Sequence, residues 1–143
     1  ELILVSPLTR CLETFLYGVE PLFQKQNLKN IPIMAHPLLR ERVYTTSDTG
    51  RPALYLARDF PSVDFSSCPS KDPWWYVGDG NENDPTTEWR PSGQNQWYAV
   101  PGEPEDVFEE RMRELDEWLG NRPEKTILIV THWGVLRHLT NGT

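Results

Sequence analysis

The sequence predicts an α/β domain built on a mainly parallel sheet that is flanked by helices. Three short apolar runs, at residues 2–5, 31–35 and 126–131, have the length and composition of buried strands. A helix is predicted after the first run and another after the third, and two further helices are predicted between the second and third runs. Strands that alternate with helices are typical of a parallel sheet. Because 143 residues match one domain of ordinary size, we expect a single domain over residues 1–143.

The first run, residues 2–5, contains only apolar residues, which predicts a strand buried on both faces. Ser6 and Pro7 then predict a helix start, with Ser6 as the N-cap and Pro7 at the first helical position. Apolar residues recur at helical spacing up to Val19, so we expect a helix from about Pro7 into the low twenties. Gly18 weakens its second half.

The second run, residues 31–35, predicts a short strand. Pro32 has no N–H to donate to a ladder, which places this strand at or near a sheet edge. A loop centred on residues 39–44 is expected to follow.

A short helix is predicted next, from about Arg51 to Arg58. Ser47 and Asp48 can cap its start, and Pro61 ends it.

Residues 66–104 form an irregular region that is rich in proline and glycine. It also holds Trp74, Trp75, Trp89 and Trp97, whereas disordered segments are poor in aromatic residues. We therefore predict an ordered excursion, laid over the domain as a lid. The alternative is a loosely packed surface insertion.

The clearest helix begins near Pro104 with an acidic first turn, which suits the helix dipole. Gly120 is a plausible C-cap, and the third strand, at 126–131, is expected to be buried. Residues 132–134 predict a tight turn, and residues 135–139 begin a last helix. The buried stripe of the long helix is predicted to be Val107, Met112, Leu115, Trp118 and Leu119.

The composition excludes several classes of function. There are 14 Lys and Arg residues against 21 Asp and Glu residues, and the net charge is −7, so we expect no nucleic-acid partner. No apolar run approaches the roughly 18 residues that a membrane span needs, so we expect no membrane partner. The three histidines lack the spacing of a metal site. No glycine-rich phosphate loop is present, which disfavours an ordinary nucleotide-binding domain.

The two cysteines also limit the possible chemistry. Cys11 and Cys68 are too few for a disulfide framework, and Cys11 lies in an apolar segment where a buried side chain is expected. Neither begins a Cys-x5-Arg loop, which excludes a cysteine-based phosphatase. No signal peptide is visible, so a reducing cytoplasmic location is the expectation.

Polar residues follow two of the predicted strands directly, where each strand gives way to a helix. Arg10 comes one helical turn after the first strand, and His132 follows the third. Ligands of open α/β sheets bind beyond the carboxyl ends of the strands, and helix N-termini there favour anions. Arg10 offers a bidentate cation, His132 a hydrogen-bonding imidazole, and Gly134 a close backbone approach. Each signal alone is more often structural, but together they predict a phosphate or carboxylate site.

Three motifs resemble those of the histidine phosphatase superfamily, which has a phosphoglycerate mutase-like fold. The segment Ser6-Pro7-Leu8-x-Arg10-x-x-x-Thr14 resembles the second motif of that family. Ile129-Val130-Thr131-His132-x-Gly134-Val135-Leu136-Arg137 resembles its C-terminal motif. Leu39-Arg40-Glu41-Arg42 stands where the family has an acidic residue that is often followed by arginine. Residues 60–66 also resemble a segment of plant-type members, so the resemblance covers essentially the whole chain.

The resemblance implies hydrolysis of a phosphomonoester through a phosphohistidine intermediate, without a cofactor or metal. Arg10 would clamp the phosphoryl group, and His132 would be the second, positively charged histidine beside the nucleophile. Glu41 would protonate the leaving oxygen, and Arg42 would hold a phosphate or carboxylate of the substrate. The backbone N–H of Trp133 would donate to an oxyanion. The implied partner is a small phosphorylated substrate or a phosphopeptide.

The sequence departs from the family in one essential motif. Its nucleophile lies in an Arg-His-Gly triplet, which does not occur here: His36 precedes Pro37, and His138 lies between Arg137 and Leu139. The chain also opens at Glu1 inside a predicted strand. We therefore expect an N-terminally truncated fragment of a phosphatase domain, inactive by itself.

Trp133 is a second departure, since many members have a small residue there. The alternatives are a non-catalytic phosphate-binding or scaffold member of the same fold, and a mutase-type phosphotransferase, which Glu41-Arg42-Val43-Tyr44-Thr45 matches only in part.

Overall fold

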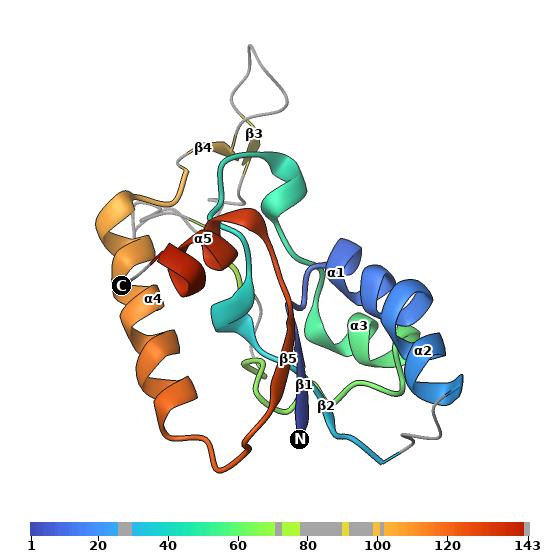
Figure 1. Ribbon diagram of the computed structural model, residues 1–143. Coiled ribbons are helices and arrows are strands. Elements are labelled where there is room, and N and C mark those ends of the chain that lie inside the picture. Colours follow the sequence, from blue (N-terminus) through green and yellow to red (C-terminus); the bar gives the residue numbers. More distant parts are fainter. Residues whose placement is uncertain (26–29, 71–72, 78–89, 92–98, 101, 142–143) are drawn as a thin grey trace.

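The computed structural model describes residues 1–25, 30–70, 73–77, 90–91, 99–100 and 102–141 (Figure 1). Its main sheet has three parallel strands in the order β2-β1-β5. The strands are β1 (Leu2–Val5), β2 (Ile33–Ala35) and β5 (Ile127–Val130). This confirms the predicted α/β class with a parallel sheet. Beyond β2, Asp64 exchanges backbone hydrogen bonds of 2.8 Å with Ile33 and Ala35, so β2 lies near a sheet edge, as Pro32 predicts.

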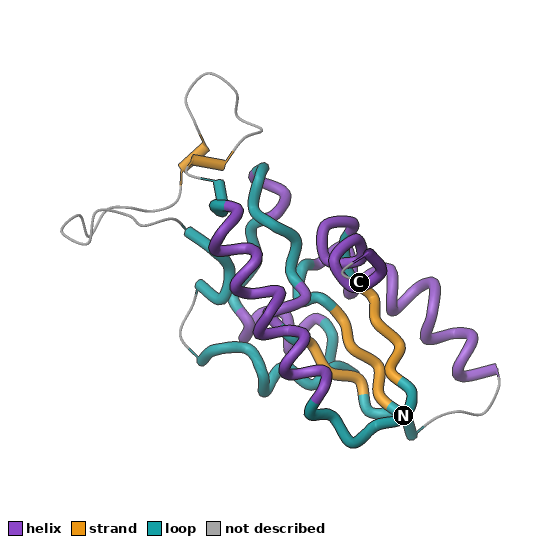
Figure 2. Tube along the Cα trace, turned by 60° about the vertical axis from the view of Figure 1, so that its left-hand side comes forward, coloured by secondary structure: helices purple, strands orange, loops and turns teal. Residues whose placement is uncertain are grey.

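Helices cover both faces of this sheet. Figure 1 shows α1, α2 and α3 on one side and α4 and α5 on the other, and in Figure 2 the strands form one layer between helices. The helices are α1 (Thr9–Thr14), α2 (Glu20–Lys25), α3 (Ala53–Asp59), α4 (Glu105–Gly120) and α5 (Trp133–Asn141), and a π-helical turn (Phe15–Val19) joins α1 to α2. Two 3-10 turns (Pro37–Leu39 and Thr46–Asp48) and an antiparallel pair, β3 (Arg90–Pro91) with β4 (Ala99–Val100), complete the described elements.

The central strand β1 is buried on both faces, as its apolar run predicts. Its alternating side chains divide between two hydrophobic clusters, because neighbours in a strand point to opposite faces. Ile3 and Val5 pack with residues of α1 and α3, whereas Leu2 and Leu4 pack with residues of α4 and α5. The helices on each face therefore have their own half of the core. No helix in the described residues is long and apolar enough to span a membrane.

The first helix begins later than the predicted Ser6 cap. The N-cap is Leu8, and α1 starts at Thr9. Ser6 continues the strand direction instead, because its N–H donates to the carbonyl of Val130 at 2.9 Å. Its side-chain oxygen accepts from the Leu8 N–H at 3.3 Å, which closes a turn before the helix. Gly18 lies in the π-helical turn, which carries the helix on into α2.

Asp48 caps a different element from the predicted one. The helix α3 begins at Ala53 after Pro52, without a side-chain cap. Asp48 instead closes the 3-10 turn at Thr46–Asp48, where its Oδ2 accepts from the N–H groups of Tyr44 and Thr45 at 3.1 and 2.9 Å. Asp48 therefore shapes the loop before α3, not the helix.

Two predictions of burial are wrong. Val107 in α4 is 38% exposed, and the charged Arg111 takes a place on the buried face of that helix. Leu128 in β5 is also 38% exposed, because β5 pairs only with β1 among the described residues and so forms an outer strand. Gly120 is the last residue of α4, one position before the cap at Asn121.

The structure describes only part of the predicted excursion. Trp74 is buried in the same cluster as Ile3 and Val5, and its indole N–H donates to the carbonyl of Arg51 at 2.8 Å. Trp74 and Trp75 also crowd Gly50, where a Cβ would stand 2.3 Å from the Trp74 ring. This part is therefore packed onto the domain. Trp89 and Trp97 lie outside the described residues, and the lid stays a prediction.

Candidate active site

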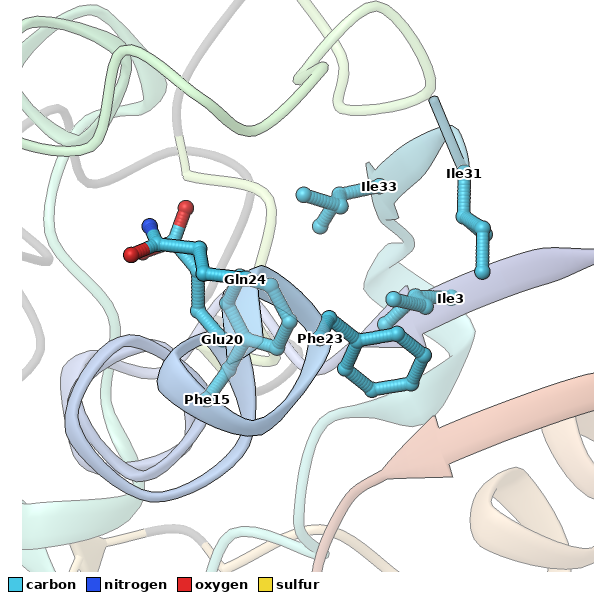
Figure 3. Close-up of a pocket in the computed structure, with 7 residues that line it drawn as sticks. All are labelled: Ile3, Phe15, Glu20, Phe23, Gln24, Ile31 and Ile33. Atoms are coloured by element: carbon cyan, nitrogen blue, oxygen red, sulfur yellow. The ribbon is translucent and has the colours of Figure 1, made fainter. Parts of the chain in front are cut away.

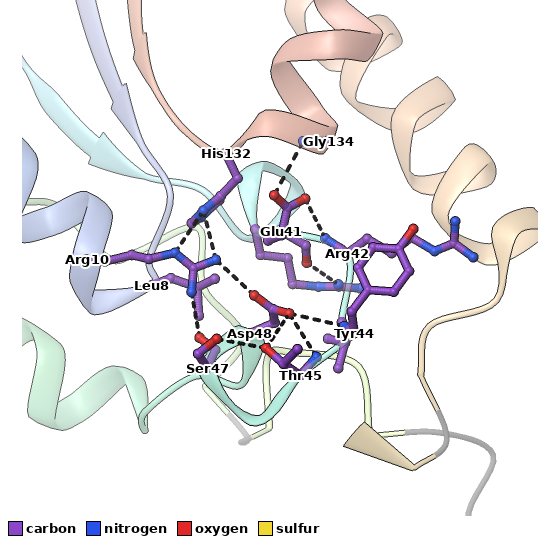
Figure 4. A network of polar contacts seen from close by, with 12 residues as sticks. Leu8, Arg10, Glu41, Arg42, Tyr44, Thr45, Ser47, Asp48, His132 and Gly134 are labelled. Carbon is purple, nitrogen blue, oxygen red and sulfur yellow. Dashed lines mark hydrogen bonds and ion pairs between the residues drawn. The ribbon is translucent and has the colours of Figure 1, made fainter. Parts of the chain in front are cut away.

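The carboxyl ends of β1 and β5 bring Arg10 and His132 together (Figure 4). The two strands pair in register up to Val5 and Val130, so the segments that follow them start side by side. The Arg10 guanidinium lies 3.2 Å (Nε) and 3.0 Å (Nη2) from Nδ1 of His132. The two residues that the strand-end pattern singled out are thus direct neighbours. Their chemical roles stay predictions.

His132 is buried and hydrogen-bonded at both ring nitrogens. Because Arg10 can only donate, Nδ1 accepts, and Nε2 carries the proton toward Ser6 Oγ at 2.7 Å. Burial, and then the charge of Arg10, lower the pKa of His132 to about 4. The imidazole is therefore neutral at pH 7. This differs from the expected positive histidine, since a buried imidazole beside a guanidinium is costly to protonate.

Arg10 is held on three sides while 42% of its side chain stays exposed. Besides His132, its guanidinium binds the carbonyl of Ser47 at 2.6 Å and Asp48 Oδ1 at 3.0 Å. Asp48 is itself buried and anchored by backbone N–H groups. Arg10 is thus a fixed cation with an open side. Asp48 is a site residue that its sequence context does not reveal, because an aspartate before a predicted helix is typical of a cap.

The Glu41 carboxylate lies at the N-terminus of α5. Its Oε1 accepts from the N–H of Arg42 at 3.0 Å, and its Oε2 accepts from the N–H of Gly134 at 3.3 Å. A Cβ at Gly134 would stand only 2.5 Å from Glu41 Oε1, so this approach needs glycine. A carboxylate therefore lies at the helix start, where it binds the Gly134 N–H, and the role of the Trp133 N–H as a donor to an oxyanion stays a prediction.

These residues surround a pocket of about 370 Å³. Four of the five predicted site residues line it, namely Arg10, Glu41, Arg42 and Trp133. The fifth, His132, lies behind the lining and contacts Arg10. A pocket of this size suits a small molecule. The full lining is Arg10, Glu41, Arg42, Tyr44, Thr45, Asp48, Glu105, Phe108, Trp133, Gly134 and Arg137.

The cations of the pocket differ in how firmly they are held. Arg42 pairs with Glu105, donates to the carbonyl of Glu103 at 2.8 Å and lies 4.8 Å over the Tyr44 ring. Arg137, which the sequence analysis did not single out, lies 5.4 Å over the exposed ring of Trp133. Trp133 and Arg137 are four residues apart in α5, and in a helix this spacing is the sequence signal that indicates such a contact.

The other candidate nucleophiles and ligands have structural surroundings. Burial raises the pKa of the Cys11 thiol to about 11, so it stays protonated although it lies 3.4 Å from His132 Nε2. The ring of His36 lies 4.3 Å from that of Trp118, and His138 binds Asp116 at 2.8 Å. Among the residues that the structure describes, no group of three or more His, Cys, Asp or Glu could hold a metal ion.

A second pocket, of about 380 Å³, opens between α2 and the neighbouring strands β1 and β2 (Figure 3). Its lining is mainly apolar, with Ile3, Phe15, Phe23, Ile31 and Ile33 beside the polar Glu20 and Gln24. None of these described lining residues is a cation, so they do not suit a phosphate.

Comparison with known proteins finds one informative similarity. Over 132 residues, 92% of this chain, the sequence is 30% identical to a protein of Schizosaccharomyces pombe (strain 972 / ATCC 24843) named a probable phosphatase. The match covers 50% of that protein, so the chain spans about half the length of this relative. No protein-family model and no solved structure matches the chain.

Proposed function

We propose that this chain carries the phosphate-binding part of a phosphatase that hydrolyses phosphomonoesters of small molecules or peptides. The similarity to a protein named a probable phosphatase supports the activity. One observation in the structure carries the site: the Arg10 guanidinium is fixed by His132, Ser47 and Asp48, yet faces the pocket that holds Glu41.

Phosphoryl transfer depends chiefly on positioning and on positive charge around the transferring oxygens. In the proposed site Arg10 binds those oxygens, and its anchors remove the need to reorganise it during the reaction. Glu41, in its protonated form, gives its proton to the leaving oxygen. Arg42 and Arg137 lie on the pocket wall where a further anionic group of the substrate can bind.

His132 has a supporting role in this scheme. Its neutral form accepts a hydrogen bond from Arg10 and donates to Ser6, so it orients the guanidinium. A phosphoryl dianion bound at Arg10 would favour the protonated imidazole, because a nearby negative charge raises the pKa of a histidine. An imidazolium can only donate, so a protonated Nδ1 would give up its contact with Arg10 and donate to the phosphoryl group instead. The positive histidine that the family resemblance implies therefore requires this exchange of partners on binding.

The finer proposal is a phosphohistidine intermediate of the histidine phosphatase type. Both nitrogens of His132 are engaged, and the sequence has no Arg-His-Gly triplet, so the nucleophile would come from a further segment. The length of the relative supports this, since it is about twice that of the matched region. The 143-residue chain should then bind phosphate without turning over a substrate.

Binding of inorganic phosphate to the 143-residue chain tests the site directly. Arg10→Ala removes a charge-assisted contact worth roughly 1.5–3 kcal/mol, so Kd should rise at least about tenfold. Arg113→Ala is the matched control, because Arg113 is exposed on α4, where it pairs with Glu110 and does not line the pocket. Calorimetric titration measures both. Equal affinity in the wild-type chain and the Arg10 variant would reject the site.

A non-catalytic phosphate-binding member is the second candidate, and the absent triplet favours it. Rapid-quench experiments with 32P-labelled substrate, on the protein as its source makes it, distinguish the two. An acid-labile phosphoenzyme supports the phosphatase. Phosphate binding without any phosphoenzyme or turnover supports the binding protein.

A further inference from the structure

A buried ionic cluster lies next to the pocket but does not line it. Its centre is Glu103, whose side chain is fully buried, and its two cations are Arg40 and Arg111. Arg40 binds the two carboxylate oxygens at 2.6 and 2.8 Å, and Arg111 binds them at 3.1 Å each. Glu103 thus receives four charge-assisted hydrogen bonds from two guanidinium groups.

The cluster has two cations and one anion, and further guanidinium N–H groups donate to backbone carbonyls of residues 38–41. Arg111 donates to the carbonyls of Leu38 and Arg40 at 2.8 and 2.9 Å, and Arg40 donates to the carbonyl of Glu41 at 3.2 Å. Burying such charges is costly, so a cluster like this is a poor source of stability but a strong constraint on geometry.

Glu103 also binds residues on both sides of Glu41, through the side chains of Arg40 and Arg42 and the backbone of Val43. Its carboxylate accepts from the N–H of Val43 at 3.2 Å, and its own N–H donates to the carbonyl of Val43 at 2.8 Å. Its carbonyl accepts from Nε of Arg42 at 2.8 Å. Arg40, Arg42 and Val43 are therefore all tied to one residue. The side chain of Glu41, which lies between them in the sequence, points toward Gly134 instead, as Figure 4 shows.

We propose that Glu103 is a positioning residue for the pocket: it fixes the backbone of residues 40–43 so that Glu41 and Arg42 face the bound phosphomonoester. This inference rests on the proposed function. It does not involve Arg10, whose anchors His132, Ser47 and Asp48 are separate from the cluster. Glu103 should therefore affect protonation of the leaving group and leave phosphate binding nearly unchanged.

The test uses the full-length protein and a series of aryl and alkyl phosphates whose leaving groups differ in pKa. Loss of a general acid slows poor leaving groups more than good ones. Glu103→Gln keeps the shape of the side chain and removes its charge. We expect kcat/KM to fall about tenfold or more for alkyl phosphates and about twofold or less for p-nitrophenyl phosphate. The Kd for inorganic phosphate should change by less than about threefold.

Two further variants separate positioning from loss of stability. Leu115→Ala removes a buried side chain of α4, the helix that carries Arg111, outside the ionic cluster. Its effect on rate should therefore not depend on the leaving group. Arg40→Lys keeps the charge and breaks the bidentate contact, so it tests the cluster if the Glu103 variant does not fold. It should show the same leaving-group dependence as Glu103→Gln.

The double variant with Glu41→Gln completes the test. If Glu103 acts through Glu41, adding Glu103→Gln to Glu41→Gln gives no further leaving-group-dependent loss. A loss of rate that is equal for all leaving groups, in Glu103→Gln or in Arg40→Lys, overturns the inference. The proposed function still stands in that case if Glu41→Gln slows poor leaving groups more than good ones. If Glu41→Gln itself shows no such dependence, the proposed acid is wrong and the inference falls with it.

Discussion

At the scale of single residues, the neutral state of His132 links the site to the stability of the fold. Burial holds the pKa of His132 near 4, and burial also holds the pKa of His36 near 4, well below the ordinary value of 6.5. Below pH 6.5 these two histidines become protonated in the unfolded chain, whereas in the folded chain they stay neutral until the pH approaches 4. The stability that the neutral histidines contribute is therefore complete above pH 6.5 and is lost as pH falls toward 4.

We expect each of these histidines to lower the free energy of unfolding by about 2 kcal/mol between pH 7 and pH 5. Urea unfolding at a series of pH values measures this slope. His132→Gln should remove about half of it, and His36→Gln should remove the other half. His138, which is paired with Asp116 at the surface, offers the control variant. A slope that survives both substitutions would contradict the neutral assignment.

At the scale of elements, the start of α5 depends on a close contact with the loop before the pocket. Gly134→Ala places a Cβ within 2.5 Å of Glu41 Oε1, the far end of a flexible side chain that can move away. Alanine also favours a helix over glycine by about 1 kcal/mol. We expect an unchanged or higher Tm, together with a slower reaction of poor leaving groups because Glu41 is displaced. Thermal unfolding and the same phosphate series measure the two effects. A lower Tm with unchanged activity would reject this account.

Elements were predictable where a local pattern governs them. The periodicity of apolar residues predicted β1, the continuous helix after it and α4, because burial of one stripe or run needs no information from elsewhere. The predicted caps at Ser6 and Asp48 failed because both residues take part in other structures. The Ser6 N–H extends the strand by donating to Val130, and Asp48 closes the 3-10 turn and binds Arg10.

At the scale of the whole molecule, β1 joins the two halves of the core. Leu4 is fully buried between the sheet and α4, so Leu4→Ala should lower the free energy of unfolding by about 2–5 kcal/mol. Leu54 is a matched control in α3, because its side chain is 77% exposed and Leu54→Ala should change stability by less than about 0.5 kcal/mol. Urea unfolding compares the two. Equal effects would contradict the central place of β1.

The sequence by itself determined the α/β architecture and the meeting of Arg10 with His132. Both follow from local order: an apolar run makes a buried strand, and parallel strands bring the residues at their carboxyl ends to one edge. Only the tertiary structure decided the neutral state of His132, the anchoring of Arg10 by Asp48 and the cluster around Glu103. These depend on burial and on contacts between residues such as Arg40 and Glu103, which are 63 positions apart and share no local pattern.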